Sequence, residues 1–137
     1  MSWPFSGLPD RCAPIMLPAM PFTHADIEDL RAEVQAFADA RDWAQFHTPR
    51  NLLLAVQSEL GEVAEIVRWQ GDADPAIPPE RKQDWDDEIA DTMILLLRLA
   101  DRSGVDLTTA IRRKLVKAGE KYPVEQFRGS NRKYDST

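Results

Sequence analysis

Cysteine, histidine and long apolar runs are scarce in this chain. Its 137 residues include one cysteine, Cys12, and two histidines, so no disulfide can form within the chain. The longest apolar stretch, residues 93–97, is far short of the ~20 residues that cross a bilayer. A domain of this length buries about two thirds of its unfolded surface and needs no disulfide or structural metal to fold. We therefore expect a cytoplasmic protein that is neither membrane-spanning nor disulfide-stapled.

Several catalytic signatures are missing as well. The sequence has no glycine-rich phosphate loop, no nucleophile elbow, no His-Glu-x-x-His and no Cys-x-x-Cys. Its histidines are His24 and His47, and a mechanism based on histidine as the general base is not expected.

Basic residues are fewer than acidic ones and are unevenly placed. The formal charge is -6, but residues 106–137 hold eight basic and four acidic residues, against nine and nineteen in the rest. So acidic a chain is not expected to bind nucleic acid through its whole surface. The distribution is compatible with a polyanionic ligand that binds through metal ions on the acidic part and through the basic segment.

Proline content and apolar spacing divide the chain into three segments. Residues 1–22 carry five of the ten prolines without periodicity, which predicts an irregular arm. Residues 23–122 show apolar residues recurring every three or four positions, as in helices that bury one face. Residues 123–137 are predicted to form a basic tail.

Four helices are predicted in the central segment. Thr23 with Asp26 resembles a capping box, Thr48 followed by Pro49 is a helix start, and Asp106 is a further N-cap. The predicted helices span residues 23–41, 49–70, 79–102 and 107–121. No strand pattern competes, so we predict an all-α four-helix bundle. The third helix is apolar on nearly every side, which favours completion of the bundle by oligomerisation.

Two rows of carboxylates accompany the second and third helices. On a helical wheel, Glu59 lies at the edge of the apolar stripe, with Glu62 and Glu65 further round, while Glu88 and Asp91 share one face of the third helix. The stripe consists of Leu52, Leu53, Val56, Leu60, Val63 and Val67. Two acidic rows that face one core repel unless a cation lies between them. Hard oxygen ligands favour Mg²⁺ or Mn²⁺.

The alternative is that both rows are ordinary solvated faces. Glu65 would then pair with Arg68, and the acidic residues of the third helix would only complement the dipole at its N-terminus.

The two spacings resemble a known signature. Glu59-x-x-Glu62 and Glu88-x-x-Asp91 resemble the motifs of the MazG-like all-α nucleoside triphosphate pyrophosphohydrolases. Further blocks look like the dCTP pyrophosphatase branch of that family. These blocks are RDWAQFHTPRNLLLA at 41–55, ELGEVAEIVRW at 59–69, and KYPVEQFRGS at 121–130 with Lys133 and Tyr134.

The resemblance implies a Mg²⁺-dependent enzyme that hydrolyses a deoxynucleoside triphosphate to the monophosphate and pyrophosphate, by attack of water on the α-phosphorus. It implies that Glu59, Glu62, Glu88 and Asp91 bind the metal, and that Glu59 and Glu62 are catalytic. Glu65 is a further catalytic candidate, as a group that orients the water. Members of the family form tetramers built from dimers, so the resemblance also implies a homo-oligomer.

Aromatic residues are the candidates for binding the base. The resemblance places Trp43 and Trp69 beside the pocket, and Phe46 and His47 lie in the same block as Trp43. An aromatic face stacks on any base and contributes affinity more than selectivity. Core packing is the alternative for Trp43 and Phe46, and a hydrogen bond at the start of the second helix is the alternative for His47.

Basic residues near the C-terminus are the candidates for binding the triphosphate. They are Lys117, Lys121 and Arg128, reached across a subunit boundary or in the same chain. For each of them, a solvated surface position is the alternative.

Three positions depart from the branch. Val34 replaces an expected histidine, Leu95 a pocket tyrosine and Ala118 an asparagine. Apolar replacements discriminate poorly between bases, so we predict a looser or shifted base preference. The competing functions are a dUTP or broad-specificity pyrophosphohydrolase and a non-catalytic helical interaction module.

Overall fold

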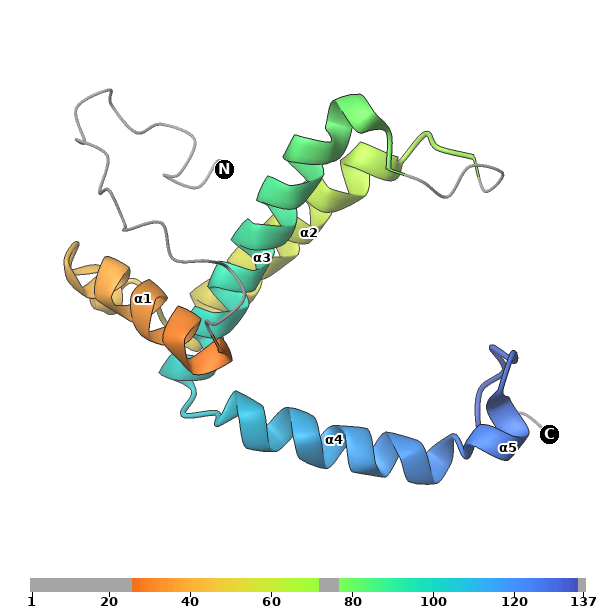
Figure 1. The fold of residues 1–137 in the computed structure, drawn as a ribbon. Helices are drawn as coiled ribbons and strands as arrows, with labels where there is room; N and C mark the ends of the chain where they lie inside the picture. The colour runs from red at the N-terminus through yellow and green to blue at the C-terminus, as the bar shows by residue number, and fades with distance from the viewer. Residues whose placement is uncertain (1–25, 72–76, 136–137) are drawn as a thin grey trace.

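The computed structural model describes residues 26–71 and 77–135, and every regular element within these ranges is helical. The elements are α1 (Ile27–Asp39), η2 (Trp43–Gln45), α2 (Pro49–Val67), η3 (Pro79–Arg81), α3 (Lys82–Arg102), α4 (Leu107–Lys121) and α5 (Val124–Phe127) (Figure 1). The all-α class is therefore confirmed. The predicted arm over residues 1–22 lies outside the described residues.

Two of the predicted helix starts are confirmed. The Thr48 hydroxyl accepts a hydrogen bond from the backbone N–H of Asn51, and Pro49 occupies the first helical position. At α4, the Asp106 carboxylate accepts from the backbone N–H of Thr109 at 2.9 Å. Both side chains satisfy N–H groups that the first turn of a helix leaves without an internal partner.

The start of α1 lies one turn later than predicted. Asp26 is itself the N-cap, and its carboxylate accepts from the backbone N–H groups of Glu28 and Asp29. The side chain of Asp29 in turn accepts from the N–H of Asp26 and closes a capping box. The predicted capping box placed Asp26 inside the first turn of the helix, and this was wrong. Asp26 has extended backbone and caps two N–H groups, so the helix begins at the next residue. Thr23 lies outside the described residues.

Other element boundaries differ from the predictions by a few residues. The helix α2 ends at Val67 rather than near residue 70, and a 3₁₀ turn precedes α3 over residues 79–81. The predicted tail contains the short helix α5. Its Phe127 ring packs edge-on against Tyr122 at a centroid distance of 5.1 Å, so this segment is folded locally.

The core is the interface between α2 and α3, which run antiparallel and side by side along most of their length (Figure 1). Leu52 and Val56 of α2 pack against Leu95 of α3, with Ala55 and Leu99 at the margin. The helix α1 lies across α3 and forms the next largest contact.

The buried stripe of α2 differs from the prediction. Glu59 and Ile66 are buried with Leu52 and Val56, whereas Leu53 and Leu60, placed in the stripe by the wheel, are 51% and 50% exposed. Burial at positions 52, 56, 59 and 66 follows a single helix face. Glu59 therefore lies in the middle of the buried face and not at its edge.

The helix α4 does not close a bundle within the described chain. It runs away from α1, α2 and α3 and touches mainly the beginning of α1 (Figure 1). From Ile111 to the end of α4 every residue is exposed, including Leu115 and Val116. Four long helices are present as predicted, but a single chain leaves the fourth without apolar cover. Oligomerisation stays a prediction. No helix in the described ranges has the length and apolar character needed to cross a membrane.

Replacing Leu52 by alanine should destabilise the protein by about 2–5 kcal/mol, because a fully buried leucine leaves a cavity at the α2–α3 interface. Chemical denaturation monitored by circular dichroism measures this loss. The matched control is Leu53→Ala on the adjacent, exposed position, which should cost less than about 1 kcal/mol. Equal losses for the two variants would contradict the observed face of α2.

Candidate metal centre

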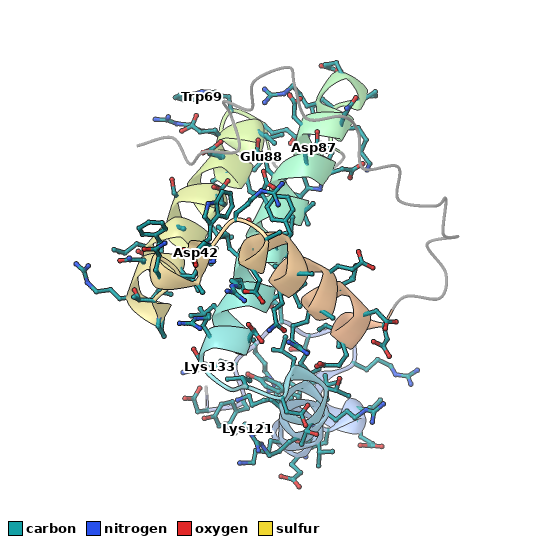
Figure 2. All side chains as sticks on the ribbon, turned by 90° about the vertical axis from the view of Figure 1, so that its left-hand side faces the viewer. Asp42, Trp69, Asp87, Glu88, Lys121 and Lys133 are labelled. Atoms are coloured by element: carbon teal, nitrogen blue, oxygen red, sulfur yellow. The ribbon has the colours of Figure 1, made fainter. Side chains whose placement is uncertain are left out.

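Three carboxylates converge where α2 and α3 face each other. Glu59 comes from α2, and Glu88 and Asp91 come from successive turns of α3; each offers an oxygen within 4.8 Å of the other two. Glu59 is only 6% exposed, and the other two side chains are partly buried. Figure 2 shows Glu88 near the end of the α2–α3 pair where α3 begins.

The cluster continues directly into the hydrophobic core. Leu95 lies one helical turn beyond Asp91 on the same face of α3 and packs against Val56, which lies one turn before Glu59 on α2. The packing that aligns the two helices therefore also sets the register of the carboxylates.

Burial and mutual repulsion disfavour the charged form of these carboxylates. The pKa of Glu59 is raised by burial and then by the charges of Glu62, Asp91 and Glu88. Burial, followed by neighbouring carboxylates, also raises the pKa of Glu88 and of Asp91. Within the described ranges no lysine or arginine forms an ion pair with Glu59, Glu88 or Asp91.

The donor set fits a hard divalent cation. Carboxylate oxygens from two rigid helices, with no thiol or imidazole among them, are the ligands that Mg²⁺ and Mn²⁺ prefer. A cation at this point would replace the repulsion between the three groups by attraction to a shared charge.

The other two predicted glutamates of α2, Glu62 and Glu65, differ in their distance from the cluster and in their partners. Glu62 is exposed beside the cluster, and its charge acts on Glu59, Glu88 and Asp91. Glu65 lies outside the cluster and forms an exposed ion pair of 2.8 Å with Arg68, the alternative weighed for it above.

Trp43 and His47 form an aromatic wall against Leu95 and Arg98 of α3, which lie one and two helical turns beyond Asp91. Their rings meet edge-on at a centroid distance of 5.8 Å. They line a small cavity of about 20 Å³ together with Leu95 and residues of α1, and such a volume accommodates about one water molecule. The His47 side chain is buried, its Nδ1 accepts from Arg98 Nε at 3.2 Å, and its backbone carbonyl accepts from Arg102 Nε at 3.1 Å. Both bonds tie His47 to α3, and a bond from its side chain to the start of α2 stays a prediction.

The other predicted aromatic residues lie apart from this wall. Phe46 is largely exposed and does not line the cavity. Trp69 is 85% exposed at the end of α2, where the Arg68 guanidinium lies 4.8 Å from its ring centroid. Figure 2 shows Trp69 at the same end of the molecule as Glu88.

The predicted phosphate-binding residues are not brought to the carboxylates. Lys117 and Arg128 are exposed on α4 and after α5, and Lys121 lies 4.8 Å from the Tyr134 ring. Figure 2 places Lys121 at the end of the molecule opposite to Glu88. In one chain the basic segment and the acidic cluster are separate.

Sequence reasoning missed a buried arginine. Arg98 is 3% exposed and contacts the carboxylate of Asp101 and the ring of His47. It is the one charged residue of the apolar run over residues 93–100, and this isolated charge was the available signal.

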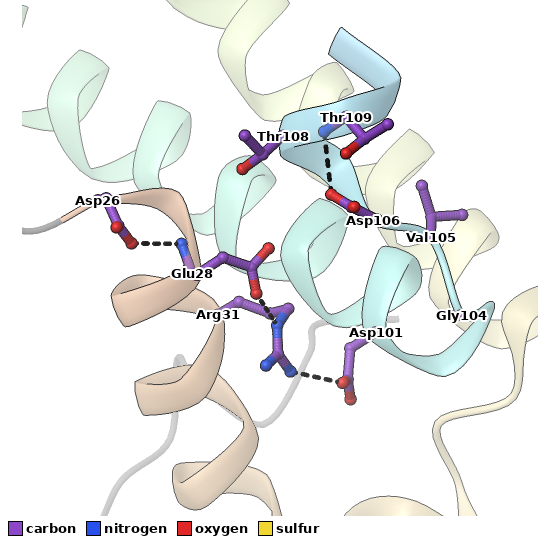
Figure 3. Close-up of a pocket in the computed structure, with 9 residues that line it drawn as sticks. All are labelled: Asp26, Glu28, Arg31, Asp101, Gly104, Val105, Asp106, Thr108 and Thr109. Atoms are coloured by element: carbon purple, nitrogen blue, oxygen red, sulfur yellow. Dashed lines mark hydrogen bonds and ion pairs between the residues drawn. The ribbon is translucent and has the colours of Figure 1, made fainter. Parts of the chain in front are cut away.

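A larger hollow of about 630 Å³ lies elsewhere, between the ends of α1, α3 and α4 (Figure 3). Asp26 and Asp106 line it and already accept hydrogen bonds from the first turns of α1 and α4. The N–H groups that would attract an anion there are thus satisfied by the chain's own carboxylates. None of the predicted site residues lines this hollow.

Comparison with known proteins decides the family. The model of the MazG-like family matches residues 58–136, which include all four predicted metal ligands. The chain belongs to the MazG-like family. The matched residues include the second half of α2 and all of α3, the two helices that carry the predicted metal ligands.

Individual MazG-like relatives agree with this assignment. Over 111 residues the chain is 44% identical to dCTP pyrophosphatase 1 of Mus musculus and 41% identical to that of Homo sapiens. The match covers 79% of this chain but 65% of each relative, so the chain spans slightly less than two thirds of their length. A solved pyrophosphatase from Archaeoglobus fulgidus has 34% identity and a TM-score of 0.67, over 76% of this chain and 98% of that one.

Glu59→Gln should raise the melting temperature of the metal-free protein by a few degrees at neutral pH, because it removes one charge from a repelling cluster. The sign follows from the raised pKa values of the three carboxyls. The folded state holds these protons more tightly than the unfolded chain, so their contribution to stability falls as the pH rises above the unfolded carboxyl pKa of about 4. Differential scanning fluorimetry from pH 4 upward, without metal, measures it.

Mg²⁺ should stabilise the wild type and leave Glu59→Gln nearly unchanged. Glu33→Gln, at an exposed position of α1, is the matched control and should respond as the wild type does. If all three proteins gain the same stability from Mg²⁺, the cation binds somewhere other than this cluster.

Proposed function

We propose that this chain is a Mg²⁺-dependent pyrophosphohydrolase of deoxynucleoside triphosphates. The observation that carries the proposal is the convergence of Glu59, Glu88 and Asp91 within 4.8 Å on two packed helices. The names of the relatives support the reaction class, since they are called pyrophosphatases.

The proposed metal ligands are Glu59, Glu88 and Asp91, with Glu62 completing the set from the exposed side. A bound Mg²⁺ would supply the positive charge that a triphosphate needs in this acidic site and would polarise its phosphoryl oxygens. Mn²⁺ has the same ligand preference and is the expected substitute.

The proposed reaction is the addition of water at the α-phosphorus. The water oxygen bonds to this phosphorus, the bond from the phosphorus to the bridging oxygen of the β-phosphate breaks, and pyrophosphate leaves with that oxygen. A carboxylate must accept the proton that the water loses. Glu62 is our candidate because it is exposed beside the cluster and has two oxygens, of which one can accept the proton while the other completes the metal ligands. Glu65 is instead held in an ion pair with Arg68.

For the base we propose dCTP or a modified dCTP as the favoured substrate, in line with the names of the mammalian relatives. The aromatic wall of Trp43 and His47 offers stacking, and Val34 and Leu95 beside it offer no hydrogen bonds. A wall of this kind rejects a wrong base weakly, so dUTP or several deoxynucleotides are the alternative. The cavity has the volume of about one water molecule, so a base fits into it only if the lining residues move apart.

For the triphosphate we propose that a second copy of the chain supplies the basic residues. Lys121 lies at the end of the molecule opposite to Glu88 (Figure 2), and α4, which carries Lys117 and Lys121, is exposed over its second half. Arg128 follows directly after α5. An apolar face that includes Leu115 and Val116 gains stability by contact with another copy. A homo-oligomer, a tetramer by family resemblance, would satisfy both requirements.

Turnover of canonical and 5-modified deoxynucleoside triphosphates should require Mg²⁺ and yield monophosphate and pyrophosphate, fastest with dCTP types. Asp91→Asn should lower kcat/KM about 100-fold, and Glu33→Gln should not change it, because only the first removes a proposed metal ligand. Ion-exchange chromatography separates pyrophosphate from phosphate. The same products from another base would move the substrate preference, while no turnover together with no Mg²⁺ binding would favour the non-catalytic interaction module.

Supply of basic residues by a second copy is testable by complementation. Glu59→Gln alone and the double variant Lys121→Ala/Arg128→Ala alone should each be nearly inactive. Co-expressed as mixed oligomers, they should recover up to roughly a quarter of the wild-type activity, because some sites combine intact carboxylates with intact basic residues. Activity of the mixture no greater than that of the separate variants would place both sets in one chain.

A further inference from the structure

Arg98 of α3 is almost completely buried, and its guanidinium has partners on three sides. Nε donates to Nδ1 of His47 at 3.2 Å, Nη1 donates to Asp101 Oδ2 at 2.8 Å, and Nη2 lies 3.6 Å from Asp39 Oδ1. A buried guanidinium is retained only where such partners offset its desolvation. Its planar, five-donor shape fixes the direction of each bond.

Asp101 holds this guanidinium in place. One of its oxygens accepts from Arg98. The other accepts from Arg31 of α1 at 2.8 Å, the contact drawn in Figure 3. Arg31 is also bonded to Glu28 at 2.8 Å. The orientation of Arg98 is therefore set by α1 and α3 together, before any ligand binds.

The hydrogen bond from Arg98 determines the state of His47. An arginine N–H can only donate, so Nδ1 of His47 must be the acceptor, and the proton of a neutral imidazole is then on Nε2. Burial, followed by the charges of Arg98 and Arg102, lowers the pKa of His47. The ring is thus neutral near pH 7, in one tautomer.

This histidine is part of the aromatic wall that lies against Leu95, one helical turn from Asp91. Its ring meets Trp43, and both line the cavity that also contains Leu95 and Arg98. Asp91, Leu95 and Arg98 follow one another at four- and three-residue spacing and so lie on one face of α3. One helix face thus carries a proposed metal ligand, the floor of the cavity and the group that orients the wall.

We propose that Arg98 is a positioning residue for the nucleobase. It holds His47 as the Nε2–H tautomer and thereby sets the ring against which Trp43 packs at the side of the cavity. The consequence for nucleotide binding rests on the proposed function, whereas the consequence for His47 does not.

The first test is the tautomer of His47 by NMR. Labelling histidine with ¹⁵N in a His24→Gln background leaves one histidine to observe. In the otherwise wild-type protein at pH 7, we expect an unprotonated Nδ1 and a protonated Nε2. In Arg98→Lys, which keeps the charge but lacks the planar donor, the two nitrogen resonances should move toward each other. Arg112→Lys, an exposed replacement on α4, is the control and should leave them unchanged.

The second test separates binding from chemistry. With dCTP and Mg²⁺, Arg98→Lys should raise KM about tenfold, equivalent to about 1.4 kcal/mol, and change kcat less than about twofold. A tenfold loss in kcat at constant KM would overturn the positioning role, because the residue would then act on the reacting phosphates.

Failure of the positioning role and failure of the proposed function can be told apart even if a variant does not fold or the enzyme is inactive. If Arg98→Lys does not fold, the double variant Arg98→Met/Asp101→Asn replaces it in both tests, because it removes the charges of both partners together. A wild-type His47 that is charged at pH 7, or protonated on Nδ1, overturns the proposal without any variant. Absence of turnover with every nucleotide, with the expected tautomer present, would refute the proposed function and leave the positioning of His47 standing.

Discussion

The repulsion among three partly buried carboxylates is the constraint on which the rest of this structure depends. Glu59, Glu88 and Asp91 meet at the interface that also forms the hydrophobic core, and no lysine or arginine of the described chain pairs with them. The apolar contact between Leu52 and Leu95 therefore holds together a site that is unfavourable by its own electrostatics. Without a cation the three carboxylates repel one another. With a cation bound, the same positions would supply its ligands without rearrangement of the helices.

A buried positive charge lies nearer the C-terminal end of α3. Two turns beyond Asp91, Arg98 is buried, contacts the carboxylates of Asp101 and Asp39 and donates to His47. The two cluster carboxylates that α3 carries thus lie in its first half, and a guanidinium paired with Asp101 lies near its end. The cavity between them is apolar because Leu95 and the α1 residues line it. The nucleotide of the proposed function would meet these two surroundings with its phosphates and its base.

The single chain is incomplete at its fourth helix. The exposed residues of α4, among them Leu115 and Val116, have no cover in the described chain, and the basic residues near its end are remote from the carboxylates. In the short segment that follows, Tyr122 packs edge-on against both Phe127 and Tyr134. If one copy supplies basic residues to the carboxylates of another, its basic end must keep its fold away from its own chain. The exposed helix α4 and the aromatic contacts after it meet this requirement.

The sequence by itself determined the all-α class, the starts of α2 and α4 at Thr48 and Asp106, and the presence of an acidic row on each of two helices, because caps and helical periodicity are local properties. That carboxylates of the two rows converge was decided by the packing of α2 against α3. Only the tertiary structure decided that Glu59 lies in the middle of the buried face. It also decided that Glu65 does not join the cluster and that α4 leaves the bundle. Burial is set by which helix packs against which, and a wheel of one helix contains no information about its neighbour. The role of Arg98 was hidden for the same reason, since its partners come from three separate parts of the chain.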